Sequence, residues 1–279
     1  MSISIKQALT EGQQSIFHSD SAALDAELIL LHTLNTHRNI LFTDPTKCLT
    51  QDQYALYKEL LQRREYGEPV AYIIGEQGFW DLMLNVAPHT LIPRGDTESL
   101  IDWVLEQGLQ PKRILDLGTG TGAIALALAK EFSHAQVIGV DLIPQAVELA
   151  NSNKLKNNIN NVQFLQSSWF ENVPPEPYDL IVSNPPYIDE LDEHLSQGDV
   201  RFEPASALIA SQQGLSDLYW IAQQAQQYLT QGGCLLMEHG WQQAEPVSNY
   251  LQQQGYDKVG SGRDLAGQWR FSFGFKSLY

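Results

Sequence analysis

An apolar segment that runs directly into a glycine-rich turn constrains the fold of this chain more than any other feature. Residues 113–117 (Arg-Ile-Leu-Asp-Leu) have the pattern of a strand buried on both faces, and Gly-Thr-Gly-Thr-Gly follows at 118–122. Glycine allows a tight turn and a close approach of the backbone to a ligand. A helical pattern continues over 122–130. A strand, a glycine turn and a helix in this order predict the ligand-binding start of an α/β domain.

Strand and helix patterns alternate through the rest of the chain. Further strands are predicted at 136–140, 162–165, 178–183, 233–238, 256–260 and 269–275. Further helices are predicted at 99–107, 145–155, 215–229 and 243–254. This alternation predicts a doubly wound, Rossmann-like α/β fold, in which ligands bind beyond the carboxyl ends of the strands. We place this domain at residues 95–279.

The chain before residue 95 divides into two parts. Apolar residues recur at helical spacing in several segments of residues 1–75, so we predict a small helical domain there. Residues 79–86 have the pattern of a strand, and Pro-His-Thr at 88–90 has that of a turn. We therefore predict a β-hairpin linker at residues 76–94.

The charge balance bears on possible partners. The whole chain has a formal net charge of −16, and residues 1–75 carry six Lys or Arg against nine Asp or Glu. Residues 76–279 carry 11 against 24. Proteins that bind nucleic acid gain much of their affinity by neutralising phosphates. Because neither part is basic, we expect no direct nucleic-acid partner, whereas a cationic cofactor or a basic protein would suit this charge.

The composition indicates a globular cytoplasmic protein. The chain has 279 residues, of which 43% are hydrophobic and 18% charged, and this suits about two folded domains. Residues 1–12 lack the apolar core of a secretory signal, and the apolar stretch 123–129 is too short to span a membrane. Cys48 and Cys234 show no metal-binding spacing, so we expect a reducing compartment and no metal site.

A second motif, Asn184-Pro185-Pro186-Tyr187, follows the predicted strand at 178–183. Proline has no N–H, so two prolines leave backbone carbonyls without a local donor, and Asn184 adds a side-chain carbonyl. Such acceptors can bind both hydrogens of a planar NH2 group, and Tyr187 offers a flat face for packing. We predict a site for an amide or an aromatic amine. The alternative is a rigid turn that only ends the strand.

The glycine turn suits two kinds of adenosine-containing cofactor. Its spacing satisfies the dinucleotide pattern G-x-G-x-x-A, and Asp141 ends the next strand, where it can bind ribose hydroxyls. Asp116 suits the methionine ammonium of S-adenosylmethionine better than a pyrophosphate, and hydride transfer does not need residues 184–187. We therefore favour S-adenosylmethionine over a nicotinamide. Trp169 can cover the adenine ring, or it can simply pack in the core.

With both motifs in place, the chain resembles the release factor glutamine methyltransferase family over most of its length. The other matching segments are Leu-Ile-Pro-Arg at 91–94, Asp-Thr-Glu at 96–98, Gly-Asp-Val-Arg-Phe-Glu-Pro at 198–204 and Glu-His-Gly-Trp at 238–241. The resemblance implies methylation of the glutamine side-chain amide in the Gly-Gly-Gln loop of class-1 peptide chain release factors, and so a role in translation termination. It also implies a helical domain that docks the release factor, a hairpin linker and a seven-stranded methyltransferase sheet.

The resemblance assigns site residues by position. The residues implied to bind S-adenosylmethionine, and its product S-adenosylhomocysteine, are Gly118, Thr119, Gly120, Thr121, Gly122, Asp141, Trp169 and Asn184. The residues implied to hold the substrate are Asn184, Pro185, Pro186 and Tyr187, and the expected catalytic residues among them are Asn184, Pro185 and Tyr187. We expect the Asn184 side-chain oxygen and the Pro185 carbonyl to accept the two N–H bonds, and Tyr187 to pack against the glutamine. No general base is assigned.

Several positions have open roles. Ser168 stands where the family often has Asp, and residues 268–269 (Gln-Trp) stand where a charged pair is usual. Arg94 and Glu203 are candidates for a buried ion pair. Glu98 is a candidate either for the start of a helix or for the site.

Two other functions are compatible with parts of the sequence. Methylation of a nucleic-acid amino group would use the same NH2 chemistry, but the acidic charge balance disfavours it. A module that binds S-adenosylmethionine without catalysis is disfavoured by the intact residues 184–187. The acidic residues between 189 and 199 either attract a basic release-factor loop or form an ordinary solvated loop.

Overall fold

The computed structural model describes residues 3–17, 19–196 and 198–278 and divides the chain into two compact units. Unit 1 comprises Met1–Glu76 and Ser196–Phe202, and unit 2 comprises Gln77–Leu195 and Glu203–Tyr279. Each unit has its own buried apolar core. Within the described residues, no helix is both long and apolar enough to cross a membrane.

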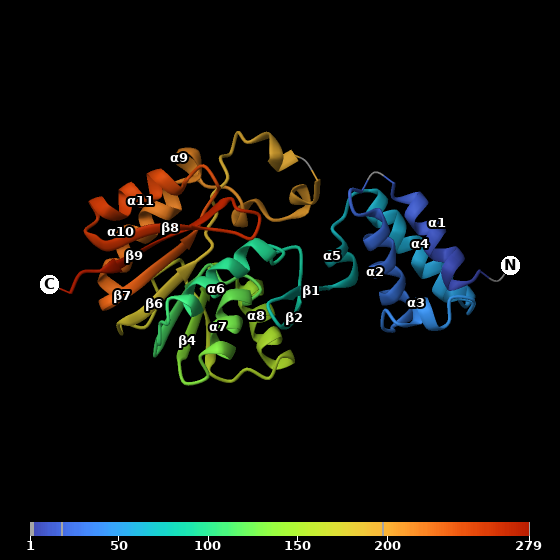
Figure 1. Ribbon diagram of the computed structural model, residues 1–279, viewed down its shortest axis with the longest axis horizontal. Coiled ribbons are helices and arrows are strands. Elements are labelled where there is room, and N and C mark those ends of the chain that lie inside the picture. The colour runs from blue at the N-terminus through green and yellow to red at the C-terminus, as the bar shows by residue number, and fades with distance from the viewer. Residues whose placement is uncertain (1–2, 18, 197, 279) are drawn as a thin grey trace. The chain divides into compact units, whose positions relative to one another are not determined.

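Unit 1 is a helical bundle, as predicted. Its helices are α1 (Ile5–Ser15), α2 (Ala22–Leu34), α3 (Ile40–Thr43), α4 (Gln51–Glu65) and α5 (Val70–Ile74) (Figure 1). Helices α1 and α4 begin with capping boxes, in which the hydroxyls of Ser4 and Thr50 accept a hydrogen bond from the backbone three residues later. The apolar faces of α1, α2 and α4 pack around the fully buried Tyr57.

Gly12 lets α1 approach its neighbours closely. A Cβ atom at Gly12 would lie 2.0 Å from the Tyr57 hydroxyl and 3.2 Å from the Ala26 Cβ. Tyr57 is buried, and its hydroxyl donates a hydrogen bond of 3.3 Å to the Ala26 carbonyl, so it has little freedom to move aside. The absence of a side chain at Gly12 is therefore a packing requirement.

We expect Gly12→Ala to lower the free energy of unfolding by about 1–3 kcal/mol, the usual cost of overpacking. Alanine in a helix would otherwise favour folding by about 1 kcal/mol. Denaturant unfolding followed by circular dichroism measures the change. Gly95→Ala is the control, because a Cβ atom there meets nothing within 4 Å. Equal stabilities of the two variants would contradict the packing argument.

The segment Ser196–Phe202 belongs to unit 1, whereas the sequence pattern placed it in the α/β domain. The Arg64 guanidinium joins this segment to the helices, since it forms ion pairs with Asp25 (Nε to Oδ2, 2.7 Å) and Asp199 (Nη1 to Oδ1, 2.8 Å). Arg201 donates a hydrogen bond of 2.6 Å to the Tyr66 carbonyl. Asp199, one of the acidic residues between 189 and 199, is therefore an ion-pair partner of Arg64 within unit 1.

Unit 2 is built on the predicted seven-stranded sheet, with the order β5-β4-β3-β6-β7-β9-β8. The strands are β3 (Arg113–Leu117), β4 (Gln136–Asp141), β5 (Val162–Gln166), β6 (Tyr178–Ser183), β7 (Leu229–Glu238), β8 (Tyr256–Arg263) and β9 (Trp269–Lys276). β9 runs antiparallel to β7 and β8, and the other neighbouring strands pair in parallel. The chain proceeds outward from β3 through β4 to β5 and then places β6 on the other side of β3. The switch point, where such sheets bind ligands, lies between β3 and β6.

Helices cover both faces of this sheet (Figure 1). On one face lie α6 (Glu98–Glu106), α7 (Ala123–Glu131) and α8 (Pro144–Lys156), and on the other lie α10 (Ser216–Tyr228) and α11 (Ala244–Gln253). Neighbouring strand residues alternate between the two cores: Ile114 packs with the first group of helices and Leu115 with the second. The loop between β6 and α10 holds η2 (Glu193–Ser196), η3 (Gly198–Phe202), η4 (Ala205–Ala207) and α9 (Ser211–Gly214).

The hairpin between the helical bundle and the sheet corrects the prediction of one continuous strand at 79–86. The structure has β1 (Glu76–Phe79) and β2 (Leu82–Asn85), and the chain turns between them at Trp80 and Asp81. Trp80 has a positive φ of 56°, and its backbone N–H donates a hydrogen bond of 2.6 Å to Glu98. This tertiary contact holds the turn, and an apolar run of residues does not reveal it.

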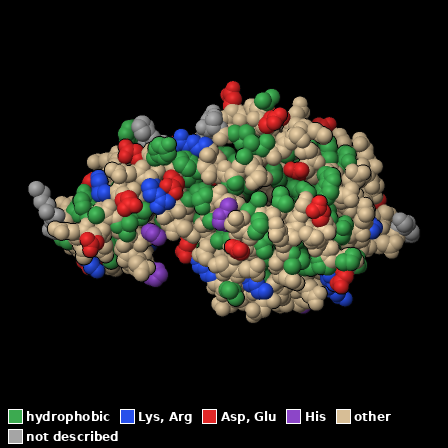
Figure 2. Space-filling view, turned by 180° about the vertical axis from the view of Figure 1, so that it is seen from behind, with side chains coloured by type: hydrophobic (Ala, Val, Ile, Leu, Met, Phe, Trp, Pro, Cys, Tyr) green, Lys and Arg blue, Asp and Glu red, His purple; other side chains and the backbone are tan. Residues whose placement is uncertain are grey.

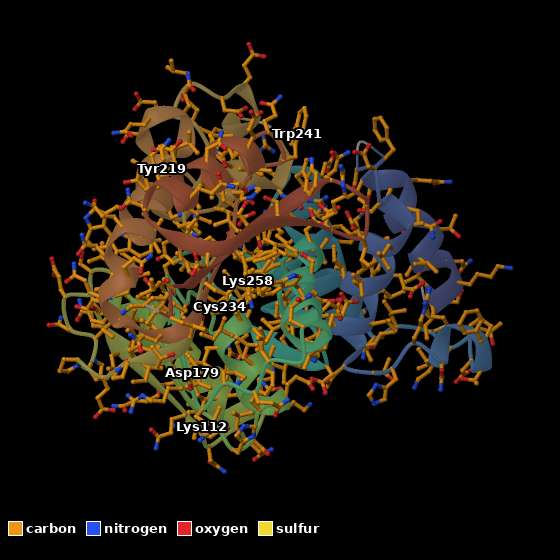
Figure 3. All side chains as sticks on the ribbon, turned by 60° about the vertical axis from the view of Figure 1, so that its left-hand side comes forward. Lys112, Asp179, Tyr219, Cys234, Trp241 and Lys258 are labelled. Carbon is orange, nitrogen blue, oxygen red and sulfur yellow. The ribbon has the colours of Figure 1, made fainter. Side chains whose placement is uncertain are left out.

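The strand register brings the carboxyl ends of the central strands together. Leu117 at the end of β3 pairs with Val140 of β4 on one side and with Ser183 of β6 on the other. At the opposite edge, Asp179 accepts hydrogen bonds from the backbone of Lys112 and Arg113. In Figure 3, Lys112 and Asp179 mark the lower edge of this unit. The glycine turn and residues 184–187 therefore both leave the sheet at its carboxyl edge.

Candidate functional site

A cavity of about 280 Å³ lies beyond the carboxyl ends of β3, β4 and β6. Its volume is near the lower end of the range for small-molecule pockets. The residues predicted from sequence that line it are Gly118, Thr119, Gly120, Thr121, Asp141, Trp169, Asn184 and Pro186. The structure thus brings together residues that lie far apart in sequence. Gly122, Pro185 and Tyr187 are not part of the cavity wall.

The glycine turn is fixed by hydrogen bonds to β4. The backbone N–H groups of Gly118 and Thr119 both donate to the Val140 carbonyl at 2.9 Å, and Gly118, Gly120 and Gly122 have positive φ angles. At Gly122 a Cβ atom would lie 2.9 Å from the Phe164 ring, and φ is +84°. Gly122 therefore serves the packing of the turn against the sheet, whereas Gly118 and Gly120 open the cavity to a ligand.

Asp141 is held rigidly at the cavity wall. Its Oδ2 accepts a hydrogen bond of 2.9 Å from Gly120, and its Oδ1 accepts one of 2.9 Å from Ile143. Burial raises the pKa of the Asp141 carboxyl, while these backbone N–H groups oppose that rise. Each oxygen retains a lone pair, so the carboxylate can accept from two vicinal hydroxyls of a ribose.

Asp116 lies beneath the glycine turn and not on the cavity wall. It is fully buried, its Oδ2 accepts a hydrogen bond of 2.6 Å from the Thr119 hydroxyl, and its Oδ1 has no partner among the described residues. Burial raises the pKa of Asp116 to about 7. Asp116 is therefore outside the cavity lining, and its hydrogen bond to Thr119 holds the turn.

Trp169 lies against the glycine turn. A Cβ atom at Gly118 would be 3.6 Å from its ring, and Trp169 has a positive φ of 48°. The Ser167 hydroxyl donates a hydrogen bond of 2.8 Å to the Trp169 carbonyl and accepts one of 2.9 Å from the Asn172 N–H, which fixes this turn. Trp169 and Ser168 both line the cavity. The indole is thus placed to stack on an adenine, and with Asp141 the wall fits an adenosine-containing ligand.

Asn184 faces the same cavity from the end of β6. Its Nδ2 donates a hydrogen bond of 3.3 Å to the Thr97 hydroxyl oxygen, and the preceding Ser183 hydroxyl donates one of 2.8 Å to the Leu117 carbonyl. Among the described residues, none donates a hydrogen bond to Asn184 Oδ1 or to the Pro185 carbonyl. Asn184 Oδ1 is therefore an available acceptor in the cavity wall, whereas Pro185 is buried and does not line the cavity.

Tyr187 points into the protein. Its hydroxyl donates a hydrogen bond of 3.1 Å to Glu238 Oε1, and burial raises the pKa of the phenol. This bond fixes the phenol hydroxyl, and the packing of Tyr187 on a substrate stays a prediction. The sequence analysis assigned no role to Thr97 or Glu238. A carboxylate at the end of a buried strand is the signal that could have drawn attention to Glu238.

The structure also shows the contacts of three residues whose roles the sequence left open. Arg94 and Glu203 form the expected ion pair through Nη2 and Oε1, and the Glu203 side chain is fully buried. Glu203 Oε2 accepts a hydrogen bond of 3.1 Å from the Ile92 N–H. Glu98 holds the hairpin through its bond to Trp80, and it does not line the cavity.

Comparison with known proteins identifies both parts of the chain. Residues 7–75 match the family model described as "PrmC N-terminal domain", and residues 110–266 match the model described as "Methyltransferase domain". A protein from Aliivibrio fischeri named release factor glutamine methyltransferase is 49% identical, with 98% of each chain covered. Proteins of the same name from Vibrio cholerae and Escherichia coli are 48% and 46% identical, with at least 95% of each chain covered.

Solved structures support the fold. A methyltransferase from Pyrococcus furiosus aligns with a TM-score of 0.54 at 19% identity, covering 79% of this chain and 99% of that chain. The rRNA methyltransferase RsmC of T. Thermophilus, in complex with AdoMet and Guanosine, aligns with a TM-score of 0.52 at 18% identity, covering 72% of this chain and 49% of that chain. At these identities the likeness concerns the fold alone.

Proposed function

This chain belongs to the release factor glutamine methyltransferase family, and from that membership we propose that Asn184 and Pro185 hold the substrate glutamine in the cavity beside the glycine turn. The chain is an S-adenosylmethionine-dependent protein-glutamine N-methyltransferase. Its substrate is a peptide chain release factor, and the acceptor is the glutamine of the class-1 Gly-Gly-Gln motif. The observation that carries this proposal is the Asn184 amide, which lines the cavity with Oδ1 free of any donor among the described residues.

The chemistry requires a poor nucleophile to be held in place. The lone pair of an amide nitrogen is delocalised into its carbonyl, so positioning must supply much of the catalysis. Asn184 Oδ1 and the Pro185 carbonyl accept one N–H each, which fixes the direction of the nitrogen. Both acceptors also stabilise the positive charge that develops on nitrogen, as preorganised dipoles do at other transition states.

The residues that line the cavity suit S-adenosylmethionine. S-adenosylmethionine supplies an electrophilic sulfonium methyl group when bound. Asp141 accepts from the ribose hydroxyls, Trp169 stacks on the adenine, and Gly118 and Gly120 leave room for the backbone approach. Arg94 lines the cavity and remains paired with Glu203, so we assign it no catalytic role. No described side chain is needed as a base, because the proton can leave after the methyl transfer.

The protein substrate suits the charge of this chain. The net charge is −16, and on the face shown in Figure 2 the Lys and Arg side chains lie singly or in small groups among Asp and Glu. Such a surface disfavours nucleic acid and suits a basic protein loop. We propose that unit 1 docks the release factor, because it presents exposed apolar side chains, among them Phe17, Phe42 and Tyr66.

Transfer of labelled methyl groups tests this function. S-adenosylmethionine labelled in the methyl group is offered with a class-1 release factor, with the same factor carrying Gln→Ala in its Gly-Gly-Gln motif, and with DNA or RNA. We expect label on the intact factor only. Label on nucleic acid alone, or equal label on the Gln→Ala factor, would overturn the proposal.

We expect Asp141→Ala to weaken S-adenosylmethionine binding by about 10- to 100-fold, because a hydrogen bond to a charged group contributes about 1.5–3 kcal/mol. Titration calorimetry measures the dissociation constant. Asp257→Ala removes an exposed carboxylate from β8 and is the control. Wild-type affinity in Asp141→Ala would show that this carboxylate does not contact the cofactor.

A further inference from the structure

The backbone of the Asn-Pro-Pro-Tyr segment makes few hydrogen bonds. Before this segment, the β6 ladder ends at Ser183. After it, the Ile188 N–H donates a hydrogen bond of 2.9 Å to the Leu208 carbonyl. Proline has no N–H, so neither proline of the segment can donate. Among the described residues, the only hydrogen bond to the backbone of residues 185–187 reaches the Tyr187 carbonyl.

That hydrogen bond comes from the Gln243 side chain, which joins three segments of unit 2. Gln243 Nε2 donates to the carbonyls of Tyr187 and Gln213, each at 3.0 Å. Gln243 Oε1 accepts from the Gly240 N–H at 2.8 Å. Because the two carbonyls can only accept and the N–H can only donate, one orientation of the amide satisfies all three bonds. The end of the motif, α9 and the turn after β7 therefore meet at one side chain.

The packing at this junction leaves the Gln243 amide little freedom. A Cβ atom at Gly214 would lie 1.9 Å from the Tyr187 carbonyl oxygen and 2.8 Å from Gln243 Nε2. A Cβ atom at Gly240 would lie 3.2 Å from Gln243 Oε1. Residues 212–214 have positive φ angles of 56°, 58° and 78°, although the first two are glutamines. Such strained backbone persists only where the surrounding contacts hold it, and it is common at functional sites.

We propose that Gln243 is a positioning residue that holds the Asn-Pro-Pro-Tyr segment in place for methyl transfer. Because each proline ring fixes its own φ angle, the segment is stiff, and a shift of the Tyr187 carbonyl displaces Asn184 as well. Gln243 does not line the cavity, so it acts through the motif. This inference rests on the proposed function, in which Asn184 Oδ1 accepts an N–H of the substrate glutamine.

The position of Gln243 at the start of α11 does not account for these bonds. A residue there often caps the helix, because its side chain accepts a hydrogen bond from a backbone N–H of the first turn. Gln243 occupies the cap position of α11, but its side chain makes no such bond. Its Oε1 accepts instead from Gly240, which precedes the helix. The Gln243 side chain therefore serves the junction with the motif and not the helix.

Gln243→Glu tests the inference, and Gln242→Glu is the matched control. An ionised carboxylate at position 243 can accept from Gly240, but it cannot donate to the two carbonyls. Single-turnover methylation of an intact release factor is measured at saturating S-adenosylmethionine and about pH 8, well above the pKa of a free glutamate. We expect Gln243→Glu to be slower by about 10- to 100-fold, the usual loss when a supporting partner is removed. Gln242 is exposed and makes none of these bonds, so Gln242→Glu should keep the wild-type rate.

Cofactor binding separates a displaced motif from a damaged domain. Asp141 and the glycine turn do not contact Gln243, so the dissociation constant of S-adenosylmethionine should stay within about threefold of wild type in Gln243→Glu. Titration calorimetry measures it. A loss of rate that is matched by an equal loss of cofactor affinity would contradict a specific effect on the motif.

Lower pH should restore part of the lost rate in Gln243→Glu. A protonated carboxyl group at position 243 regains one donor, so the ratio of the variant rate to the wild-type rate should rise as the pH falls from about 8 to about 5. The ratio removes the titration of groups that both enzymes share, such as Asp116 and Glu238, whose pKa values burial raises to about 7. A ratio that does not change with pH would overturn the inference, and so would a wild-type rate at about pH 8.

If Gln243→Glu does not fold, Gln243→Met decides. Methionine has a similar length but no N–H donor, so this variant should also lose about 10- to 100-fold in rate and keep its cofactor affinity. A wild-type rate in Gln243→Met would overturn the inference. A wild-type enzyme that does not label the glutamine would instead refute the proposed function.

Discussion

Asn184→Ala is expected to lower kcat for release-factor methylation by about 10²- to 10³-fold, the effect of removing one preorganised polar group from a transition-state site. Asn184 lines the cavity, and no described residue donates a hydrogen bond to its Oδ1. Without it, the amide nitrogen is no longer directed at the methyl group, and the charge that develops on it loses a partner. Single-turnover methylation at saturating cofactor measures the loss.

The control for this variant is Asn160→Ala. Asn160 is exposed in the turn before β5, at the amino edge of the sheet and away from the cavity. We expect the Asn160→Ala variant to have the kcat of the wild-type enzyme. Cofactor affinity should fall little in Asn184→Ala, because Asp141 and the glycine turn are untouched. A kcat within about threefold of wild type for Asn184→Ala would be incompatible with its role as acceptor.

Gly214→Ala should lower kcat/KM by about 10²-fold or more, even though Gly214 touches neither ligand. A Cβ atom at Gly214 would lie 1.9 Å from the Tyr187 carbonyl oxygen and 2.5 Å from the Tyr187 carbonyl carbon. These are backbone atoms, and the Gln243 side chain also holds that carbonyl through a hydrogen bond of 3.0 Å. The segment 184–187 must therefore shift. Displacement of a catalytic group by about 1 Å can cost about 10²-fold in rate.

Gly255→Ala is a matched control for the backbone strain. Gly255 has a φ of +82°, against +78° at Gly214, and a Cβ atom there meets nothing within 4 Å. Alanine at positive φ should cost both variants about 1–2 kcal/mol of stability, and the contact with the Tyr187 backbone should add to this loss in Gly214→Ala. Only Gly214→Ala should lose activity. If the two variants retain equal kcat/KM at a temperature where both are folded, the position of Tyr187 is not the cause.

The regular elements of unit 2 could be predicted from sequence because their signals are local. A continuous apolar run marks β3, and helical spacing marks α8. A hairpin is present, but the prediction of one continuous strand at 79–86 was wrong, because the signal that breaks this strand is not local. The turn at Trp80 is fixed by Glu98, which is 18 residues later and belongs to another element. No pattern within residues 79–86 contains that contact.

Some residues of the candidate site could likewise be predicted from sequence, and others could not. The glycine turn, Asp141 and Asn184 carry their chemistry in their own residue types, and they follow strands whose carboxyl ends must meet. Thr97 and Glu238 have no such signal, since threonine at a helix start and glutamate at a strand end have ordinary structural uses. Their hydrogen bonds, from Asn184 to Thr97 and from Tyr187 to Glu238, join residues that lie far apart in the sequence.

Sequence by itself determined the fold class, the methyl donor and the kind of acceptor group, because periodicity and motif spacing can be read from the order of residues along the chain. Only the tertiary structure decided what each residue of the motifs does. It placed Gly122 against the core, turned Tyr187 onto Glu238 and set Asp116 beneath the cofactor turn. The physical reason is that side-chain orientation and burial depend on neighbours from distant elements, which the order of residues does not specify.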